Sequence, residues 1–194
     1  MYFEPTKFEH LLGTPGFSDQ ILKNHFTLYQ GYVANTNKLV EKIIALSDSK
    51  QTATLEFAEL KHRLGWEFNG MRLHELYFQN LSKNPVPPDE NSALYKKITA
   101  QYGSLKEFEE YFRATAAMRG IGWAVSYYDK QSDFIFTCWI NEHDVGHLTG
   151  CVPILVADVF EHAYLTDYGL KRADYLDSFF KAIGWKAVEQ RFAP

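Results

Sequence analysis

Val156-Ala157-Asp158-Val159-Phe160-Glu161-His162-Ala163-Tyr164 is the stretch around which this 194-residue chain is organised. The apolar run 152–157 is typical of a buried strand, and it leads to the carboxylate of Asp158 and, four residues later, the imidazole of His162. A buried ionised carboxylate needs a partner charge or a metal, and oxygen and imidazole ligands together suit iron, manganese or zinc. Alternatively, Asp158 caps the next helix, which is a common duty of Asp, and His162 is satisfied inside that helix.

Composition limits the class of protein. The net charge is -4, and a content of 46% hydrophobic and 16% aromatic residues is enough for the core of one domain or two small ones. No stretch approaches the roughly 18 apolar residues of a membrane helix, and the start of the chain lacks the features of a signal peptide. We therefore expect a cytoplasmic protein without a membrane partner. The absence of a basic stripe argues against nucleic-acid binding, and Cys138 and Cys151 are expected to be reduced, although the sequence allows a disulfide.

The first half of the chain predicts two long helices. Residues 1–17 are broken by prolines and glycines. Ser18 is expected to cap a helix that runs to about Leu46. A polar turn at 47–53 precedes a second helical pattern over about Leu55–Leu81, so the pair predicts an antiparallel hairpin.

The second half predicts a small sheet among shorter helices. The segment Asn84–Asp89 contains three prolines and reads as an extended linker, which predicts domains at 1–84 and 90–194. The elements expected after it are helices at about 92–102 and 104–118, strands at 121–128, 134–140 and 152–158, a helix at 167–180 and a short tail helix. The fold class is therefore α+β: an N-terminal long antiparallel helical hairpin, then a C-terminal domain of helices around a three-stranded antiparallel sheet.

Two further histidines are candidates for the same site as Asp158 and His162. His25 and His74 lie on the two long helices, which can project both rings toward the sheet domain. The resulting set of three His and one Asp suits a redox metal with room for solvent. The remaining histidines in polar contexts are interpreted as solvated: His10, His62 and His147.

Several segments together resemble the iron/manganese superoxide dismutases. The opening stretch resembles their D-x-W-E-H-A-Y signature, and the order and spacing of the other motifs agree from about Ser18 to Phe192. These motifs are Tyr32-Val33-Ala34-Asn35-Thr36-Asn37, Phe68-Asn69-Gly70 followed by His74, Gly120-Ile121-Gly122-Trp123, and Arg172 followed by Tyr175.

The resemblance implies an oxidoreductase that converts superoxide to oxygen and hydrogen peroxide at one iron or manganese ion per subunit. His74, Asp158 and His162 match metal ligands. The sequence does not decide between iron and manganese, because both take the same ligands. Tyr32 matches the outer-sphere tyrosine of the substrate funnel, and Trp123 matches a tryptophan beside the metal.

The resemblance also implies a homodimer formed through Glu161, His162 and Tyr164. Glu161 matches a residue that reaches across the dimer to the partner subunit's His162, and such contacts hold a ligand ring and set its basicity. Whether two such dimers form a tetramer is left open. Arg172 is expected to help draw the superoxide anion toward a chain of net negative charge.

The first helix departs from the family pattern H-x-x-x-H-H-x-x-Y-V. Depending on the end from which it is aligned, the first ligand falls on His25 or on Asn24. We predict His25, because Tyr32 lies seven residues on, about 700° of helix, and returns to within about 20° of it; Asn24 would leave Tyr32 about 80° away. Leu28 and Tyr29 replace the family's histidine pair, and Phe160 stands where a tryptophan is usual.

These departures keep a second function open. Without a fourth ligand, His74, His162 and Asp158 would form a two-His, one-carboxylate site with a different or lost oxidative activity. A metal-free structural protein on the same fold is a third interpretation.

In this family, a Gln or His also donates a hydrogen bond to the metal-bound solvent. The position four residues before His74 is Gly70, which has no side chain, so the donor is expected from the loop at 141–144. We predict His143 over Glu142, because a neutral imidazole can donate a hydrogen bond and an ionised carboxylate can only accept one. The alternative is that His143 is a turn histidine in solvent.

Overall fold

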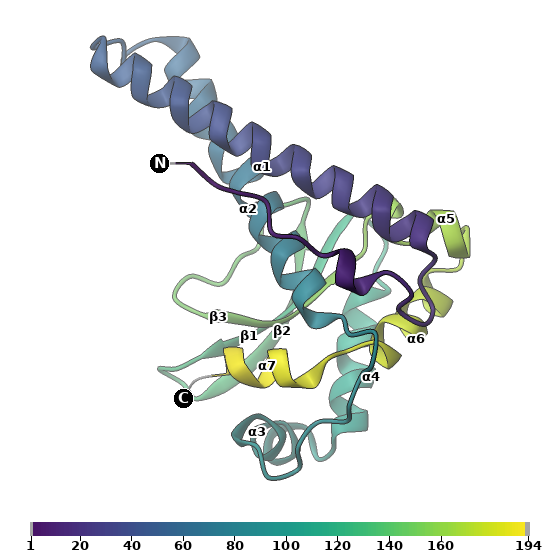
Figure 1. Cartoon of the computed structure of the whole chain (residues 1–194). Helices are drawn as coiled ribbons and strands as arrows, with labels where there is room; N and C mark the ends of the chain where they lie inside the picture. Colours follow the sequence, from purple (N-terminus) through teal and green to yellow (C-terminus); the bar gives the residue numbers. More distant parts are fainter. Residues whose placement is uncertain (1, 193–194) are drawn as a thin grey trace.

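The structure is a computed structural model that describes residues 2–192. Helices α1 (Asp19–Asp48) and α2 (Leu55–Asn80) form the predicted hairpin, whose outer end projects away from the remainder of the molecule (Figure 1). The side chain of Ser18 accepts a hydrogen bond from the Ile21 amide and caps α1, as the sequence predicted. The N-terminal segment contains a short 3-10 turn, η1 (Glu9–Leu11), and runs beside the hairpin.

The second half of the chain contains the predicted sheet. Strand β1 (Gly122–Asp129) lies in the centre and pairs antiparallel with β2 (Phe134–Asn141) on one side and β3 (Val152–Asp158) on the other. Helices α3 (Ala93–Tyr102) and α4 (Leu105–Ala116) precede it. The α+β prediction is therefore confirmed. Among residues 2–192, no helix combines the length and the apolar character that crossing a membrane requires.

The chain after β3 differs from the sequence prediction. A 3-10 turn, η2 (Glu161–Ala163), leads into a short helix, α5 (Leu165–Tyr168), and then into α6 (Arg172–Lys181) and α7 (Trp185–Arg191). The single helix predicted over 167–180 is wrong, because Gly169 ends α5 at φ 54° and ψ −129°, a conformation that no helix contains.

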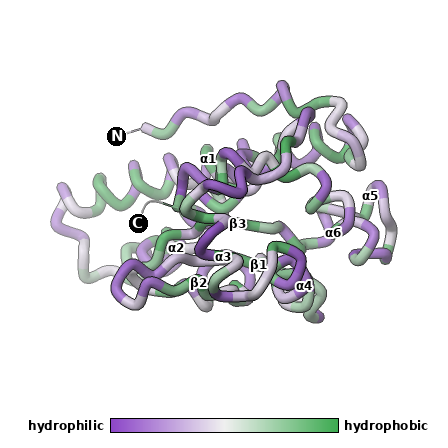
Figure 2. The backbone as a smooth tube through the Cα atoms, turned by 90° about the horizontal axis from the view of Figure 1, so that it is seen from below, coloured by the Kyte–Doolittle hydropathy of each residue, from purple (hydrophilic) through white to green (hydrophobic). Residues whose placement is uncertain are grey.

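Strand β3 is buried and is held from several sides. Figure 2 shows the hydrophobic colouring of the strand in the middle of the molecule. The side-chain amide of Asn80, at the end of α2, donates to the carbonyl of Val156 at 2.6 Å. The guanidinium of Arg191 donates to Ile154 O on β3, to Leu76 O on α2 and to the Asn80 side chain. This cross-link fixes the C-terminal part of α2 against the strand that ends in Asp158.

Candidate metal centre

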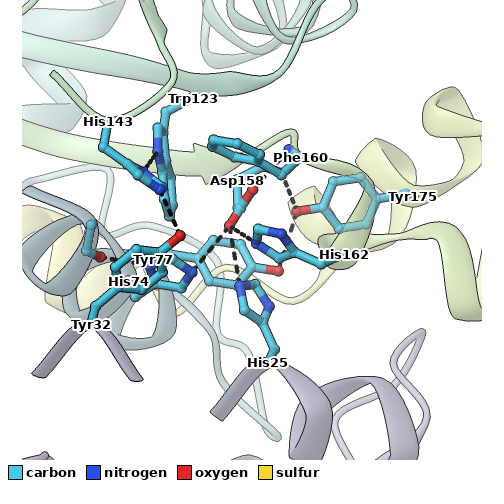
Figure 3. Close-up of polar contacts among 11 residues, drawn as sticks. His25, Tyr32, His74, Tyr77, Trp123, His143, Asp158, Phe160, His162 and Tyr175 are labelled. Atoms are coloured by element: carbon cyan, nitrogen blue, oxygen red, sulfur yellow. Dashed lines mark hydrogen bonds and ion pairs between the residues drawn. The ribbon is translucent and has the colours of Figure 1, made fainter. Parts of the chain in front are cut away.

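Four side chains from separate elements converge in one buried place (Figure 3). His25 comes from α1, His74 from α2, Asp158 from the end of β3 and His162 from the following turn. One ligand atom of each lies within 4.8 Å of those of the other three. The Nε2 atoms of His25, His162 and His74 lie 3.1, 3.0 and 3.6 Å from Asp158 Oδ2. Only His162 is partly open, with 29% of its side chain exposed.

The hydrogen bond of His74 at the edge of this cluster directs the lone pair of its Nε2 atom into the cluster. His74 Nδ1 lies 2.6 Å from the carbonyl oxygen of Gly70. Because a carbonyl only accepts, Nδ1 carries the proton and Nε2 has a bare lone pair. Within residues 2–192, His74 Nε2 has no hydrogen-bond partner, and leaving a buried polar atom unpaired is costly. Three imidazole nitrogens around one carboxylate oxygen therefore fit a bound metal ion.

The electrostatic environment keeps these groups in their ligating forms. Burial lowers the pKa of His25 and lowers the pKa of His74 well below its ordinary value, so both rings stay neutral. Burial alone would raise the pKa of the Asp158 carboxyl. The neighbouring His162 and His25 outweigh it and hold that pKa below its usual range. Neutral imidazoles and an ionised carboxylate are the states that bind metals.

The position of the first helix favours His25 over Asn24. Asn24 is exposed, and its side chain accepts a hydrogen bond from Gln20. Helix α1 is continuous over Asp19–Asp48, so Tyr32 lies on the same side as His25. The Tyr32 ring stacks on the His74 ring, with centroids 5.1 Å apart.

A line of hydrogen bonds connects Tyr32 to Trp123 through His143 (Figure 3). The Trp123 indole N–H donates to His143 Nδ1 at 3.0 Å. Since Nδ1 accepts, the proton of the neutral ring is on Nε2, which donates to the Tyr32 hydroxyl at 2.8 Å. Burial lowers the pKa of His143 to about 4. His143 is fully buried, whereas Glu142 turns away and accepts from the Trp66 indole at 2.9 Å.

The absence of a side chain at Gly70 leaves space for the Tyr32 ring. A Cβ atom at that position would lie 2.7 Å from the Tyr32 ring. Any side chain there would have to displace Tyr32, so a hydrogen-bond donor cannot come from this place on α2. The loop between β2 and β3 brings His143 to Tyr32, and donation by His143 to a metal-bound solvent stays a prediction.

Comparison with known proteins agrees with this geometry in both halves of the chain. The family described as "Iron/manganese superoxide dismutases, alpha-hairpin domain" matches residues 7–82, and "Iron/manganese superoxide dismutases, C-terminal domain" matches residues 90–191. The chain belongs to the iron/manganese superoxide dismutase family.

Similar dismutases are named for either metal. The chain is 36% identical over 182 residues to the iron superoxide dismutase of Aquifex pyrophilus, covering 91% of this chain and 84% of that one. It is 33% identical over 181 residues to the iron enzyme of Saccharolobus solfataricus, covering 91% and 86%. It is also 35% identical over 193 residues to the manganese superoxide dismutase 1 of Halobacterium salinarum, covering 97% and 92%.

Two residues that depart from the dismutase motifs have clear places in the structure. Tyr29 is buried, and its hydroxyl donates to Glu75 Oε1 and accepts from the Thr6 amide, both at 2.9 Å. It therefore ties the N-terminal segment to the hairpin. Phe160 stacks on both His143 and His162, with centroids 4.9 and 5.2 Å away.

The guanidinium group of Arg172 is held by hydrogen bonds within the protein. It donates to the carbonyls of Met118 and Gly120 at 2.6 and 2.9 Å and to the Tyr164 hydroxyl at 3.2 Å. These contacts attach α6 to the segment before β1. The role of Arg172 in attracting the superoxide of a dismutase stays a prediction.

Two hydrogen-bonded contacts near this dismutase site were not predicted from the sequence. The Tyr175 hydroxyl donates to the backbone carbonyl of Asp158 at 2.7 Å, inside the core, and no local pattern signals this contact. His147 was interpreted as solvated, but it is half-buried and hydrogen-bonded at both ring nitrogens. His10 and His62 are exposed, as predicted.

We expect the metal-free dismutase to lose stability as the pH falls from about 7 to about 5. His143 has a pKa of about 4 when folded, and burial lowers the pKa of His25 and His74 too. An unfolded histidine takes a proton near pH 6.5, so below that pH the unfolded chain binds more protons. The free energy of unfolding should fall by up to about 1.4 kcal/mol per pH unit for each such histidine.

Urea unfolding of the metal-free protein at both pH values measures this effect. His143→Gln should reduce the pH dependence, and the same change at the exposed His62 should leave it intact. Equal stability of the metal-free protein at pH 7 and pH 5 would contradict the assignment of buried neutral rings.

Proposed function

We propose that this protein disproportionates superoxide at one iron or manganese ion held by His25, His74, Asp158 and His162. The observation that carries the proposal is the convergence of three Nε2 atoms on Asp158 Oδ2, with the His74 lone pair unpartnered among residues 2–192. Because His25 joins the cluster, the site has a fourth candidate ligand, which the two-His, one-carboxylate alternative lacks. The relatives carry either metal name, and the same donor set suits both ions.

The bound ion supplies a reversible one-electron change, by which two superoxide anions and two protons become oxygen and hydrogen peroxide. The protein's part is to hold the ligands and deliver protons. The Phe160 amide donates to Asp158 Oδ1 at 2.9 Å, which orients the carboxylate. The Gly70 carbonyl fixes the His74 ring through Nδ1–H.

Tyr32 and His143 are proposed to handle protons. Burial, with the charges of Asp158 and Glu67, raises the pKa of Tyr32, so its hydroxyl stays protonated. Since that oxygen accepts from His143 Nε2–H, its own hydrogen is free to be donated toward the cluster. Trp123 is fully buried and packs edge-on against His74, with centroids 4.9 Å apart, which keeps water from that side.

A superoxide assay combined with metal analysis tests the function. Protein loaded with iron or manganese should accelerate superoxide loss, and the metal-free protein should not. Protein that binds one ion per chain and leaves the rate of superoxide loss unchanged would favour the alternative oxidative function.

We also propose a homodimer through the face formed by Glu161 and His162, beneath which Tyr164 is buried. Glu161 is exposed beside the partly exposed His162, so a second subunit can bring its own carboxylate to that ring. Large apolar side chains are exposed on the adjoining segments: Met118 50%, Ile121 38%, Leu165 47% and Leu170 92%. Isolated exposed apolar residues are normal, but such a group around a candidate ligand favours an interface.

Glu161→Ala is expected to weaken both dimer formation and metal retention, by about tenfold each, because the ring of His162 loses a supporting carboxylate. Light scattering at micromolar concentration and metal content after dialysis measure the two effects. Glu90→Ala, at an exposed acid directly after the linker, is the matched control. A wild-type chain that is monomeric in this measurement would contradict the proposal, and a mass of four chains would identify a tetramer.

A cytoplasmic location is proposed as well. It is supported by Cys138 and Cys151, which are both free thiols in the structure, because thiols stay reduced in that compartment.

A further inference from the structure

The loop between β2 and β3 carries two histidines that are attached to β1 in the same way. Trp123 donates to Nδ1 of His143, and the Tyr127 hydroxyl lies 2.6 Å from Nδ1 of His147. Both pairs are 20 positions apart in sequence. Trp123 and Tyr127 lie four residues apart on β1, hence on one face of the strand. The first pair belongs to the proposed site, whereas the second pair lies outside the proposed ligand set.

The second ring nitrogen of His147 shows what the second pair does. His147 Nε2 lies 2.9 Å from the backbone carbonyl oxygen of His143. Because a carbonyl only accepts, Nε2 carries a proton, and in the neutral ring Nδ1 then accepts from Tyr127. Burial raises the pKa of Tyr127, so the phenol keeps the proton that it donates. The imidazole is thus a rigid spacer between β1 and the main chain of His143.

This spacer holds the residue whose side chain reaches Tyr32. The neighbouring Glu142 has φ 51°, an uncommon conformation for a residue other than glycine, so the local chain does not favour this path by itself. The His147 ring holds the main chain at His143 itself, one residue after this position. Without His147, the His143 carbonyl would lose the hydrogen bond that fixes the main chain there, and the position of the ring would depend on its own hydrogen bonds and on its stacking against Phe160.

We propose that Tyr127 and His147 form a positioning pair that sets the His143 ring against Tyr32 and the metal centre. The inference rests on the proposed function for its kinetic consequence, but the placement of the ring can be measured without activity. The hydrogen bonds of His147 go to Tyr127 and to the His143 carbonyl, so His147 acts through His143.

The test compares His147→Leu with His147→Gln in the full chain. Leu removes both hydrogen bonds, whereas a Gln amide can donate to the His143 carbonyl and accept from Tyr127. We expect Leu to keep the metal content, to lower kcat about tenfold with little change in KM, and to shift the reduction potential in the direction of His143→Ala. Gln should stay within about twofold of the native rate. His62→Leu, the same change at an exposed histidine, should alter none of these quantities.

Two further measurements separate positioning from simple stability. The double variant His143→Ala/His147→Leu should be no slower than His143→Ala, because the pair acts through one ring. In the metal-free protein, the NMR signal of the Trp123 indole N–H should move in His147→Leu and stay in place in His147→Gln, whether or not the protein turns over superoxide. An unmoved indole signal and an unchanged reduction potential in His147→Leu, with only a lower Tm, would overturn the proposal. Additive losses in the double variant would also overturn it.

Discussion

Asp158→Asn is expected to release the metal and to lower the rate of superoxide dismutation by more than about 100-fold, beyond the range typical of residues outside the ligand set. The amide has nearly the same shape, but it has no charge to bind the ion, and its NH₂ group would face imidazole nitrogens. Asp158 Oδ2 is the atom that the Nε2 atoms of His25 and His162 approach most closely. Metal content per chain and the rate under pulse radiolysis measure the two losses.

The stability of this variant tests whether the loss of metal and activity arises at the site and not from unfolding. The neighbouring His162 and His25 hold the pKa of Asp158 below its usual range, so its charge stabilises the metal-free fold at pH 7. The metal-free Asn variant should therefore unfold at a somewhat lower urea concentration than the metal-free native protein, and it should remain folded without urea. Asp174→Asn, at an exposed acid in the first turn of α6, should change neither metal content nor rate. A variant at position 158 that retains one ion per chain and the native rate would remove Asp158 from the ligand set.

His143→Ala is expected to have the next largest effect: the metal stays bound, its reduction potential shifts and the rate falls about 10- to 100-fold. The substitution removes the nitrogen that accepts from the Trp123 indole N–H and the N–H group that donates to the Tyr32 hydroxyl, and both bonds are buried. His143→Gln should recover part of the rate, since a carboxamide can accept from Trp123 and donate to Tyr32.

Glu142→Ala is the matched control, because it changes the adjacent side chain and removes only the bond to Trp66. It should retain the native reduction potential and rate. If Glu142→Ala loses both while His143→Ala loses neither, the proposed donor is the wrong neighbour.

Regular secondary structure explains why much of the candidate site could be predicted from the sequence. The periodicity of α1 alone favoured His25 over Asn24, because seven residues nearly complete two helical turns. An apolar strand that ends in a carboxylate likewise placed Asp158 inside the molecule. The hairpin, the sheet and their order followed from the change between a helical and a strand period.

The failures lie where the conformation depends on distant contacts. His147 lies in a loop, and only the fold brings the Tyr127 hydroxyl to its ring. The break between α5 and α6 depends on Gly169 at positive φ, which a helical pattern does not reveal. The hydrogen bonds of Arg172 to backbone carbonyls more than 50 positions away could not be predicted from the sequence either, and its role in attracting superoxide stays a prediction. The domain boundary at 84–90 stays a prediction.

The positions of the four candidate ligands along the sequence determine when the metal site can form during synthesis. His25 and Asp158 are 133 positions apart, and ribosomes add residues at about 5–20 per second. During much of synthesis, the growing chain therefore offers only the two imidazoles of the hairpin, without the carboxylate. The complete donor set exists only after β3 has been translated and has folded against α2. Binding of the ion is therefore expected to follow the translation of His162 and the folding of the finished chain.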